Sequence, residues 1–108
     1  EREYIDVFGM IIQPLSLEII EAMLDIDPNA RIDMLQHIDQ DTPILTVTHV
    51  RQGSQADDME WPVGELIVKA NEQEVHYLDE LQKLLHENKG GDILLECDNG
   101  RIGYFTVE

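Results

Sequence analysis

Val7-Phe8-Gly9-Met10-Ile11-Ile12 is the stretch on which the interpretation of this chain depends. A glycine between apolar residues at the start of a strand permits a backbone conformation that a side chain would block. Backbone N–H groups at such a corner can point outward together and bind an anion, and the terminal carboxylate of a peptide is a small anion. Phe-Gly turns also occur in β-hairpins, so the corner alone leaves both interpretations open.

The composition indicates one acidic domain. The chain has 108 residues, of which 43% are hydrophobic, and its 7 basic and 23 acidic residues give a formal net charge of −16. Nucleic acids and anionic lipid surfaces attract basic proteins, so this charge argues against both as partners. No apolar stretch approaches the ~20 residues that a membrane span needs, so membrane insertion is not expected. Cys97 is the only cysteine of the chain, so an internal disulfide cannot form. The apolar residues that alternate around it predict a buried structural thiol.

Apolar periodicity predicts a mainly β domain with two or three short helices. We expect an extended entry, the glycine corner and a strand over 4–12, helices over 16–24, 55–60 and 78–87, and strands over 44–50, 65–70, 93–97 and 102–107. Asn99-Gly100 predicts a two-residue hairpin turn before the last strand. Residues 25–43 are polar and acidic and form an insertion.

From Val47 onward the sequence resembles the PDZ domain. The matching segments keep that family's spacing without gaps: Val47-Thr48-His49-Val50, Gly53-Ser54-Gln55-Ala56, Gly64-Glu65-Leu66-Ile67, Asn71 and Val75. The glycine corner comes first in the chain, Gln13-Pro14-Leu15-Ser16 follows it, and the closing strand is C-terminal. That order is similar to the PDZ domains of the HtrA/Deg serine proteases. Gln55 departs from the family, because Pro usually stands there.

The resemblance implies a PDZ-like, partly open β-barrel or sandwich with the strand order of bacterial protease PDZ domains. Residues 1–108 would form this single domain, with 1–5 as a linker from an upstream domain. The parent would be an HtrA/Deg-type serine endopeptidase of the bacterial periplasm or cell envelope, active in protein quality control and homo-oligomeric. Its partners would be the protease domain of the same chain and the C-termini of peptides or unfolded proteins.

The resemblance also implies a peptide groove between the strand at the glycine corner and the helix over 78–87. Extended or C-terminal segments would bind there by β-strand addition. The backbone amides of Phe8, Gly9 and Met10 would hold the carboxylate, and Met10, Ile11 and Ile12 would pair with the peptide. Leu78, Gln82 and Leu85 would face the groove from the helix, although Leu85 fits the core equally well. The candidate binding residues are Val7, Phe8, Gly9, Met10, Ile11, Ile12, Leu78, Gln82 and Leu85.

Catalysis within this chain is not expected, and neither is a cofactor. The four histidines, His37, His49, His76 and His86, do not follow a metal-ligand spacing, and no serine has a paired histidine. Two alternatives remain open. The domain could be the PDZ module of a scaffold or secretion protein, or a calcium-binding domain. The loop over 25–36 resembles an EF-hand loop, but Ala30 replaces its turn glycine and Gln36 its bidentate glutamate.

Overall fold

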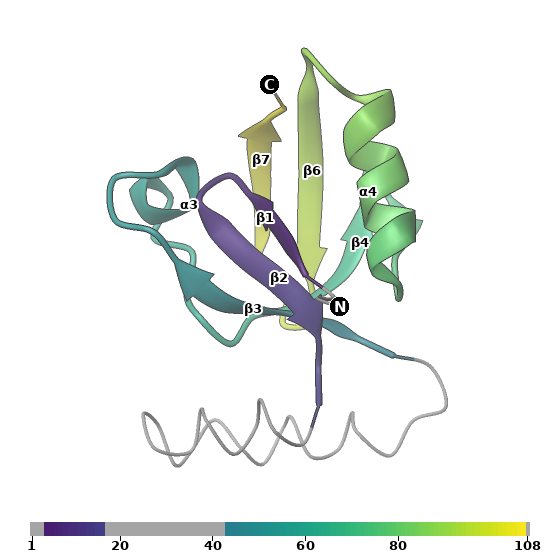
Figure 1. Ribbon diagram of the computed structural model, residues 1–108, viewed down its shortest axis with the longest axis horizontal. Helices are drawn as coiled ribbons and strands as arrows, with labels where there is room; N and C mark the ends of the chain where they lie inside the picture. The colour runs from purple at the N-terminus through teal and green to yellow at the C-terminus, as the bar shows by residue number, and fades with distance from the viewer. Residues whose placement is uncertain (1–3, 17–42, 108) are drawn as a thin grey trace.

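The computed structural model describes residues 4–16 and 43–107, and these form a mainly antiparallel β structure with two helices (Figure 1). The elements in chain order are β1 (Ile5–Val7), β2 (Met10–Pro14), β3 (Leu45–Val50), α3 (Gln55–Asp58), β4 (Leu66–Ala70), β5 (Gln73–Glu74), α4 (Leu78–Glu87), β6 (Asp92–Cys97) and β7 (Ile102–Thr106). Neither helix of this described part is long and apolar enough to span a membrane.

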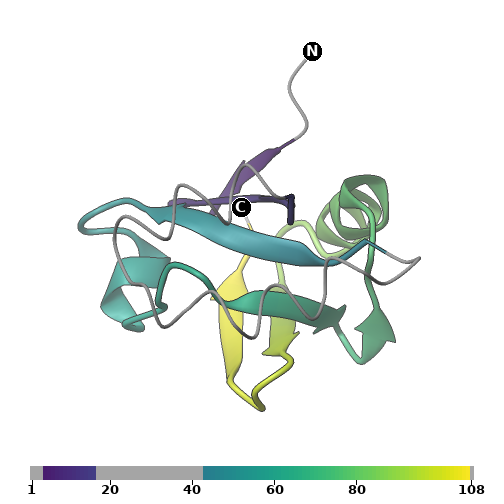
Figure 2. The ribbon, with the colours of Figure 1, turned by 90° about the horizontal axis from the view of Figure 1, so that it is seen from below.

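One sheet contains all the described strands. Its order is β1-β2-β3-β4-β6-β7, with β5 paired to β4, and every pairing is antiparallel. Strands β1 and β7 stand at the two ends of this order, so the sheet is open rather than a closed barrel. Seen from below, the strands are strongly twisted, and α4 lies at one side (Figure 2). The predicted mainly β class with short helices is confirmed.

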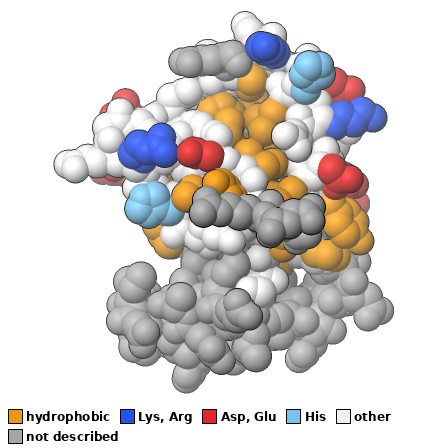
Figure 3. Space-filling model, viewed as in Figure 1, with side chains coloured by type: hydrophobic (Ala, Val, Ile, Leu, Met, Phe, Trp, Pro, Cys, Tyr) orange, Lys and Arg blue, Asp and Glu red, His pale blue; other side chains and the backbone are white. Residues whose placement is uncertain are grey.

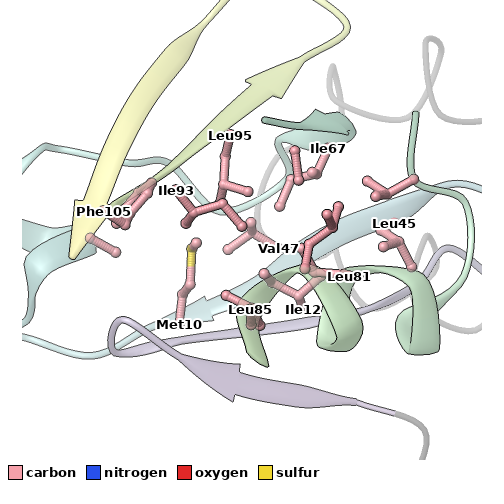
Figure 4. Close-up of a cluster of buried hydrophobic side chains, with 14 of the residues drawn as sticks. Met10, Ile12, Leu45, Val47, Ile67, Leu81, Leu85, Ile93, Leu95 and Phe105 are labelled. Atoms are coloured by element: carbon pink, nitrogen blue, oxygen red, sulfur yellow. The ribbon is translucent and has the colours of Figure 1, made fainter. Parts of the chain in front are cut away.

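The core forms between the inner face of the sheet and α4. Helix α4 is amphipathic and buries Leu81, Leu84 and Leu85, which recur at the three- and four-residue spacing of one helix face. Leu81 and Leu85 belong to the same buried cluster as Met10 and Ile12 of β2 (Figure 4). The helix and the strand that were predicted to form the two walls of a groove therefore contribute apolar side chains to the same core.

Most predicted elements are present with small shifts at their ends. The helix over 78–87 is α4 itself, and the expected strands over 44–50, 65–70, 93–97 and 102–107 correspond to β3, β4, β6 and β7. The helix expected over 55–60 is shorter, because α3 ends at Asp58. The helix predicted over 16–24 and nearly all of the insertion over 25–43 lie outside the described residues.

The two-residue turn predicted at Asn99-Gly100 is wrong. Strand β6 ends at Cys97 and β7 begins at Ile102, so four residues join them. The Gly100 N–H donates to the Cys97 carbonyl at 3.1 Å, and Gly100 has a φ of +89°. The Cys97 N–H donates to the Arg101 carbonyl at 2.8 Å, so Arg101 is still paired with Cys97. Only Asp98, Asn99 and Gly100 remain between them, and they form a three-residue turn that ends with the glycine in the left-handed conformation.

Cys97 is buried, as its apolar surroundings predict. Burial raises the pKa of its thiol above the usual range, and the negative charge of the nearby Glu65 carboxylate raises it further. A neutral thiol is a poor nucleophile, so the native protein should keep this side chain unreactive at neutral pH.

We therefore expect Cys97 to react slowly with iodoacetamide at pH 8.5 in the native protein and rapidly in urea. Above about pH 8.5 the thiol ionises in the unfolded chain while the folded thiol stays protonated. The free energy of unfolding should therefore fall as the pH rises past this value. Urea unfolding of wild type and Cys97→Ala between pH 7 and 10 isolates this contribution. Equal alkylation rates in the native and unfolded states would contradict the prediction.

Candidate functional site

The glycine corner is the turn of a β-hairpin between β1 and β2. Val7 pairs with Met10, so only Phe8 and Gly9 lie between the two strands. Their φ angles are +59° and +82°, which gives a two-residue turn of type I′. Of the two interpretations that the sequence left open, the hairpin turn is present in this structure. Capture of a carboxylate by the amides of Phe8, Gly9 and Met10 stays a prediction.

The loop over 51–56 binds the tip of this hairpin through its backbone. The Arg51 N–H donates to the Gly9 carbonyl at 2.6 Å, and the Ala56 N–H donates to the Phe8 carbonyl at 3.1 Å. Ser54 caps α3 by accepting from the Asp57 N–H at 3.2 Å, and it lies directly against Gly9. A β-carbon on Gly9 would overlap the side chain of Ser54. Glycine is therefore required here for both its conformation and its size.

Phe8 adopts a left-handed conformation in the turn, and its ring contacts an aromatic residue distant in sequence. Its ring stacks on the Phe105 ring of β7 with centroids 4.6 Å apart and planes 19° apart. The Trp61 ring meets the same Phe105 edge-on, with centroids 5.2 Å apart. Aromatic pairs of this geometry stabilise a fold by about 0.5–1.5 kcal/mol beyond their buried area. That gain offsets part of the cost of a positive φ in a bulky residue, which is about 1–3 kcal/mol.

Strand β1 occupies the outer edge of β2. The pairs are Ile5 with Ile12, Asp6 with Ile11 and Val7 with Met10. Because Met10 and Ile12 face the core, Ile5 and Val7 lie on the same inner face, where they pack partly buried against the core cluster. The other side of β2 pairs with β3. In this structure both edges of the predicted peptide-binding strand are therefore paired within the chain.

The predicted residues of α4 differ in exposure. Leu78 is partly buried and Gln82 is exposed, whereas Leu85 is buried among core residues with Met10 and Ile12. Leu81 and Leu84 are buried. Hydrophobic side chains are nevertheless visible in the middle of the face that carries β1, β2 and α4 (Figure 3). The structure brings Met10, Ile12 and Leu85 together and leaves Gln82 at the surface.

A cavity of about 520 Å3 lies beside the hairpin tip. Its lining combines the turn with the loop over 51–56 and the end of β7, and includes Val7, Phe8, Gly9, Arg51, Ser54 and Val107. The Asp6 carboxylate and the Arg51 guanidinium form an ion pair of 3.1 Å at its margin. The cavity touches the turn side of the predicted site and none of the α4 residues.

Gln55, which departs from the family pattern, has a structural contact. Its side-chain Nε2 donates to the Thr106 carbonyl at 3.0 Å, and its Oε1 accepts from the Thr106 N–H at 2.9 Å. The amide therefore pairs with both backbone groups of Thr106 on the outer edge of β7. A proline could make neither bond.

The remaining polar candidates are separate from one another. In the described ranges 4–16 and 43–107, no three His, Cys, Asp or Glu side chains are grouped as metal ligands. Ser54 Oγ donates to the Arg51 carbonyl at 2.6 Å, in keeping with a turn and cap role. His76 Nδ1 lies 3.1 Å from the Pro43 carbonyl oxygen. His37 and the loop over 25–36 lie outside the described residues, and calcium binding there stays a hypothesis.

No family model and no curated protein matches this chain.

The sequence interpretation expected an extended entry before the glycine corner but missed its pairing with β2 and the loop that holds the hairpin tip. Ile5 and Val7 alternate with polar neighbours, and two residues separate them from the next apolar run, which is a hairpin pattern. The pattern was weak because Phe-Gly is not among the favoured turn pairs. The contacts of Arg51 and Ala56 with the turn join residues more than 40 positions apart, so only the folded structure provides them.

Proposed function

We propose that this chain is a non-catalytic, PDZ-type peptide-binding domain that takes extended or C-terminal segments by β-strand addition at β2. The observation that carries this proposal is the β1–β2 ladder. The edge of β2 already holds an extended three-residue segment in antiparallel register, with its aliphatic side chains against the core. A main-chain ladder supplies affinity for such a segment, and the side-chain positions beneath it supply selectivity.

The layout of β2 and α4 supports the same proposal. Met10 and Ile12 of the strand share a cluster with Leu81 and Leu85 of the helix, so both elements border one apolar region (Figure 4). The helix also presents Gln82 at the surface next to this region. We also propose that the sheet follows a PDZ-like strand order.

We further propose that the domain belongs to an HtrA/Deg-type serine endopeptidase of the bacterial periplasm or envelope, which it regulates. The support is the sequence order of the glycine corner, Gln13-Pro14-Leu15-Ser16 and the C-terminal closing strand. The alternative is the same module in a scaffold or secretion protein. The coding sequence upstream of Glu1 distinguishes them, because a Ser-His-Asp protease domain there would favour the first and its absence the second.

Binding can be measured by fluorescence anisotropy with labelled hexapeptides that end in an apolar residue. We expect a free carboxylate to bind about tenfold or more tightly than the amidated form, because hydrogen bonds to a charged group contribute about 1.5–3 kcal/mol. Gln82→Ala should weaken binding, whereas Lys83→Ala, an exposed neighbour on the same helix, should not. Equal affinity for both peptide forms would contradict carboxylate capture. Peptide-induced exchange protection confined to β7 would contradict the proposed site.

A further inference from the structure

The proposed peptide site and strand β1 use the same edge of β2. A peptide that pairs with Met10 and Ile12 would have to lie on the edge that faces Val7 and Ile5. The opposite edge offers no alternative, because Met10 pairs there with Val50 and Ile12 with Val47 of β3. Peptide binding at β2 therefore requires that β1 leave it.

We propose that β1 is a built-in occupant of the peptide site, and that ligands bind by displacing it. This inference depends on the proposed function. The occupied state is the one in this structure, and the chain would open at the junction of Val7 and Phe8, between the strand that leaves and the turn that stays.

The contacts of β1 are weak enough for it to leave while β2 remains in place. β1 has three residues, and its Ile5 and Val7 are only partly buried, whereas Met10 and Ile12 are fully buried. The Asp6–Arg51 ion pair has side chains that are 45% and 62% exposed, and pairs this exposed contribute little to stability. A short edge strand with few buried contacts opens locally at a low free-energy cost.

The hairpin tip would stay in place when β1 leaves. The carbonyls of Phe8 and Gly9 accept hydrogen bonds from Ala56 and Arg51, and the Phe8 ring stacks on Phe105. These contacts do not involve Ile5, Asp6 or Val7. Opening would therefore free the edge of β2 and leave the turn beside the end of the incoming peptide.

The side chains of β1 also define the ligand class. Ile5 and Val7 stand two positions apart on the inner face beside Ile12 and Met10. Asp6 lies on the outer face, where Arg51 is 3.1 Å away. A ligand that replaces β1 would carry two aliphatic side chains separated by one polar residue, and an acidic residue suits the middle position. The class is an extended aliphatic–acidic–aliphatic segment.

The probe for the test is a labelled hexapeptide with the sequence of residues 2–7, Arg-Glu-Tyr-Ile-Asp-Val. The control peptide has serine in place of the isoleucine and the valine. The opened variant is Ile5→Gly with Val7→Gly, which removes the apolar contacts of β1 and leaves β2 and α4 unchanged. We expect it to bind the probe at least about tenfold more tightly than wild type, because the competent state is then more populated. Circular dichroism checks that the fold persists.

The locked variant is Asp6→Cys with Ile11→Cys. These residues face each other next to the hydrogen-bonded Val7–Met10 pair, so they form a non-hydrogen-bonded pair with a Cα separation suited to a disulfide. Oxidation should fix β1 on β2 and weaken probe binding at least about tenfold relative to the same protein in dithiothreitol. Buried Cys97 should not interfere.

The possible outcomes separate the inference from the proposed function. If the oxidised locked variant binds the probe as tightly as its reduced form, peptides bind outside the β2 edge and the displacement proposal fails. If the opened variant binds neither peptide although amide exchange at Met10 and Ile12 is faster than in wild type, β1 opens but the proposed function fails. Tight binding of the serine control to the opened variant would overturn the ligand class.

Discussion

Gly9→Ala should destabilise the domain by about 2–5 kcal/mol. Gly9 has a φ of +82°, a region that costs a residue with a side chain about 1–2 kcal/mol. Its new β-carbon would overlap Cβ and Oγ of Ser54, and overpacking of this kind costs typically 1–3 kcal/mol. Ser54 cannot easily move, because it caps α3 and donates to the Arg51 carbonyl. Urea unfolding measures the loss.

Gly53→Ala is the matched control for Gly9→Ala. Gly53 has nearly the same φ, +81°, but a β-carbon there would meet no atom within 4 Å. Its substitution should therefore show the conformational cost alone, about 1–2 kcal/mol. Gly9→Ala should also cost less in a Ser54→Gly background, where the overlapping atoms are absent. Equal losses for Gly9→Ala and Gly53→Ala would show that the contact with Ser54 does not constrain the turn.

Phe105→Ala should cost about 3–5 kcal/mol, a large part of the stability of a domain of this size. Phe105 is fully buried on β7 and lies between the rings of Phe8 and Trp61. Its loss leaves a cavity in the core and removes the stacking partner that holds Phe8 in its left-handed conformation. Thermal and urea unfolding should both show the effect.

Tyr104→Ala is the control on the same strand. Tyr104 is 66% exposed, so its removal should change the free energy of unfolding by about 0.5 kcal/mol or less. A double-mutant cycle of Phe8→Ala and Phe105→Ala should give a coupling of about 0.5–1.5 kcal/mol. A coupling near zero would mean that the stacked rings do not support the hairpin turn.

Local sequence was sufficient for most of the secondary structure. The leucine spacing over 78–87 and the alternation over 93–97 and 102–107 reflect side chains that each face one core, so the period alone identifies the element. Leu81 and Leu84 lie on the core side of the same helical period, and both are buried. The turn after Cys97 was assigned wrongly, because the Asn-Gly pair does not reveal how many residues the closing strand leaves unpaired.

The candidate site was harder to predict from the sequence than the secondary structure. Gln82 and Leu85 lie one turn apart on α4, yet only the tertiary packing of the core that Leu85 shares with Met10 and Ile12 decides that Leu85 is buried while Gln82 is exposed. Likewise, the alternation of Ile5 and Val7 is consistent with a strand but does not identify the strand with which it pairs. The register with Ile12 and Met10 comes from the folded hairpin.

The stretch from Val7 to Ile12 shows which features follow from the local sequence and which follow from the tertiary structure. By itself the sequence determined that a glycine corner precedes an apolar strand, because the glycine and the apolar run act through local backbone preferences. Only the tertiary structure decided that the corner is a closed hairpin turn. Phe8 is held there by the Phe105 ring and Gly9 by the loop over 51–56, and both partners come from distant parts of the chain. Contacts between residues so far apart in the chain produce no periodic pattern in the sequence.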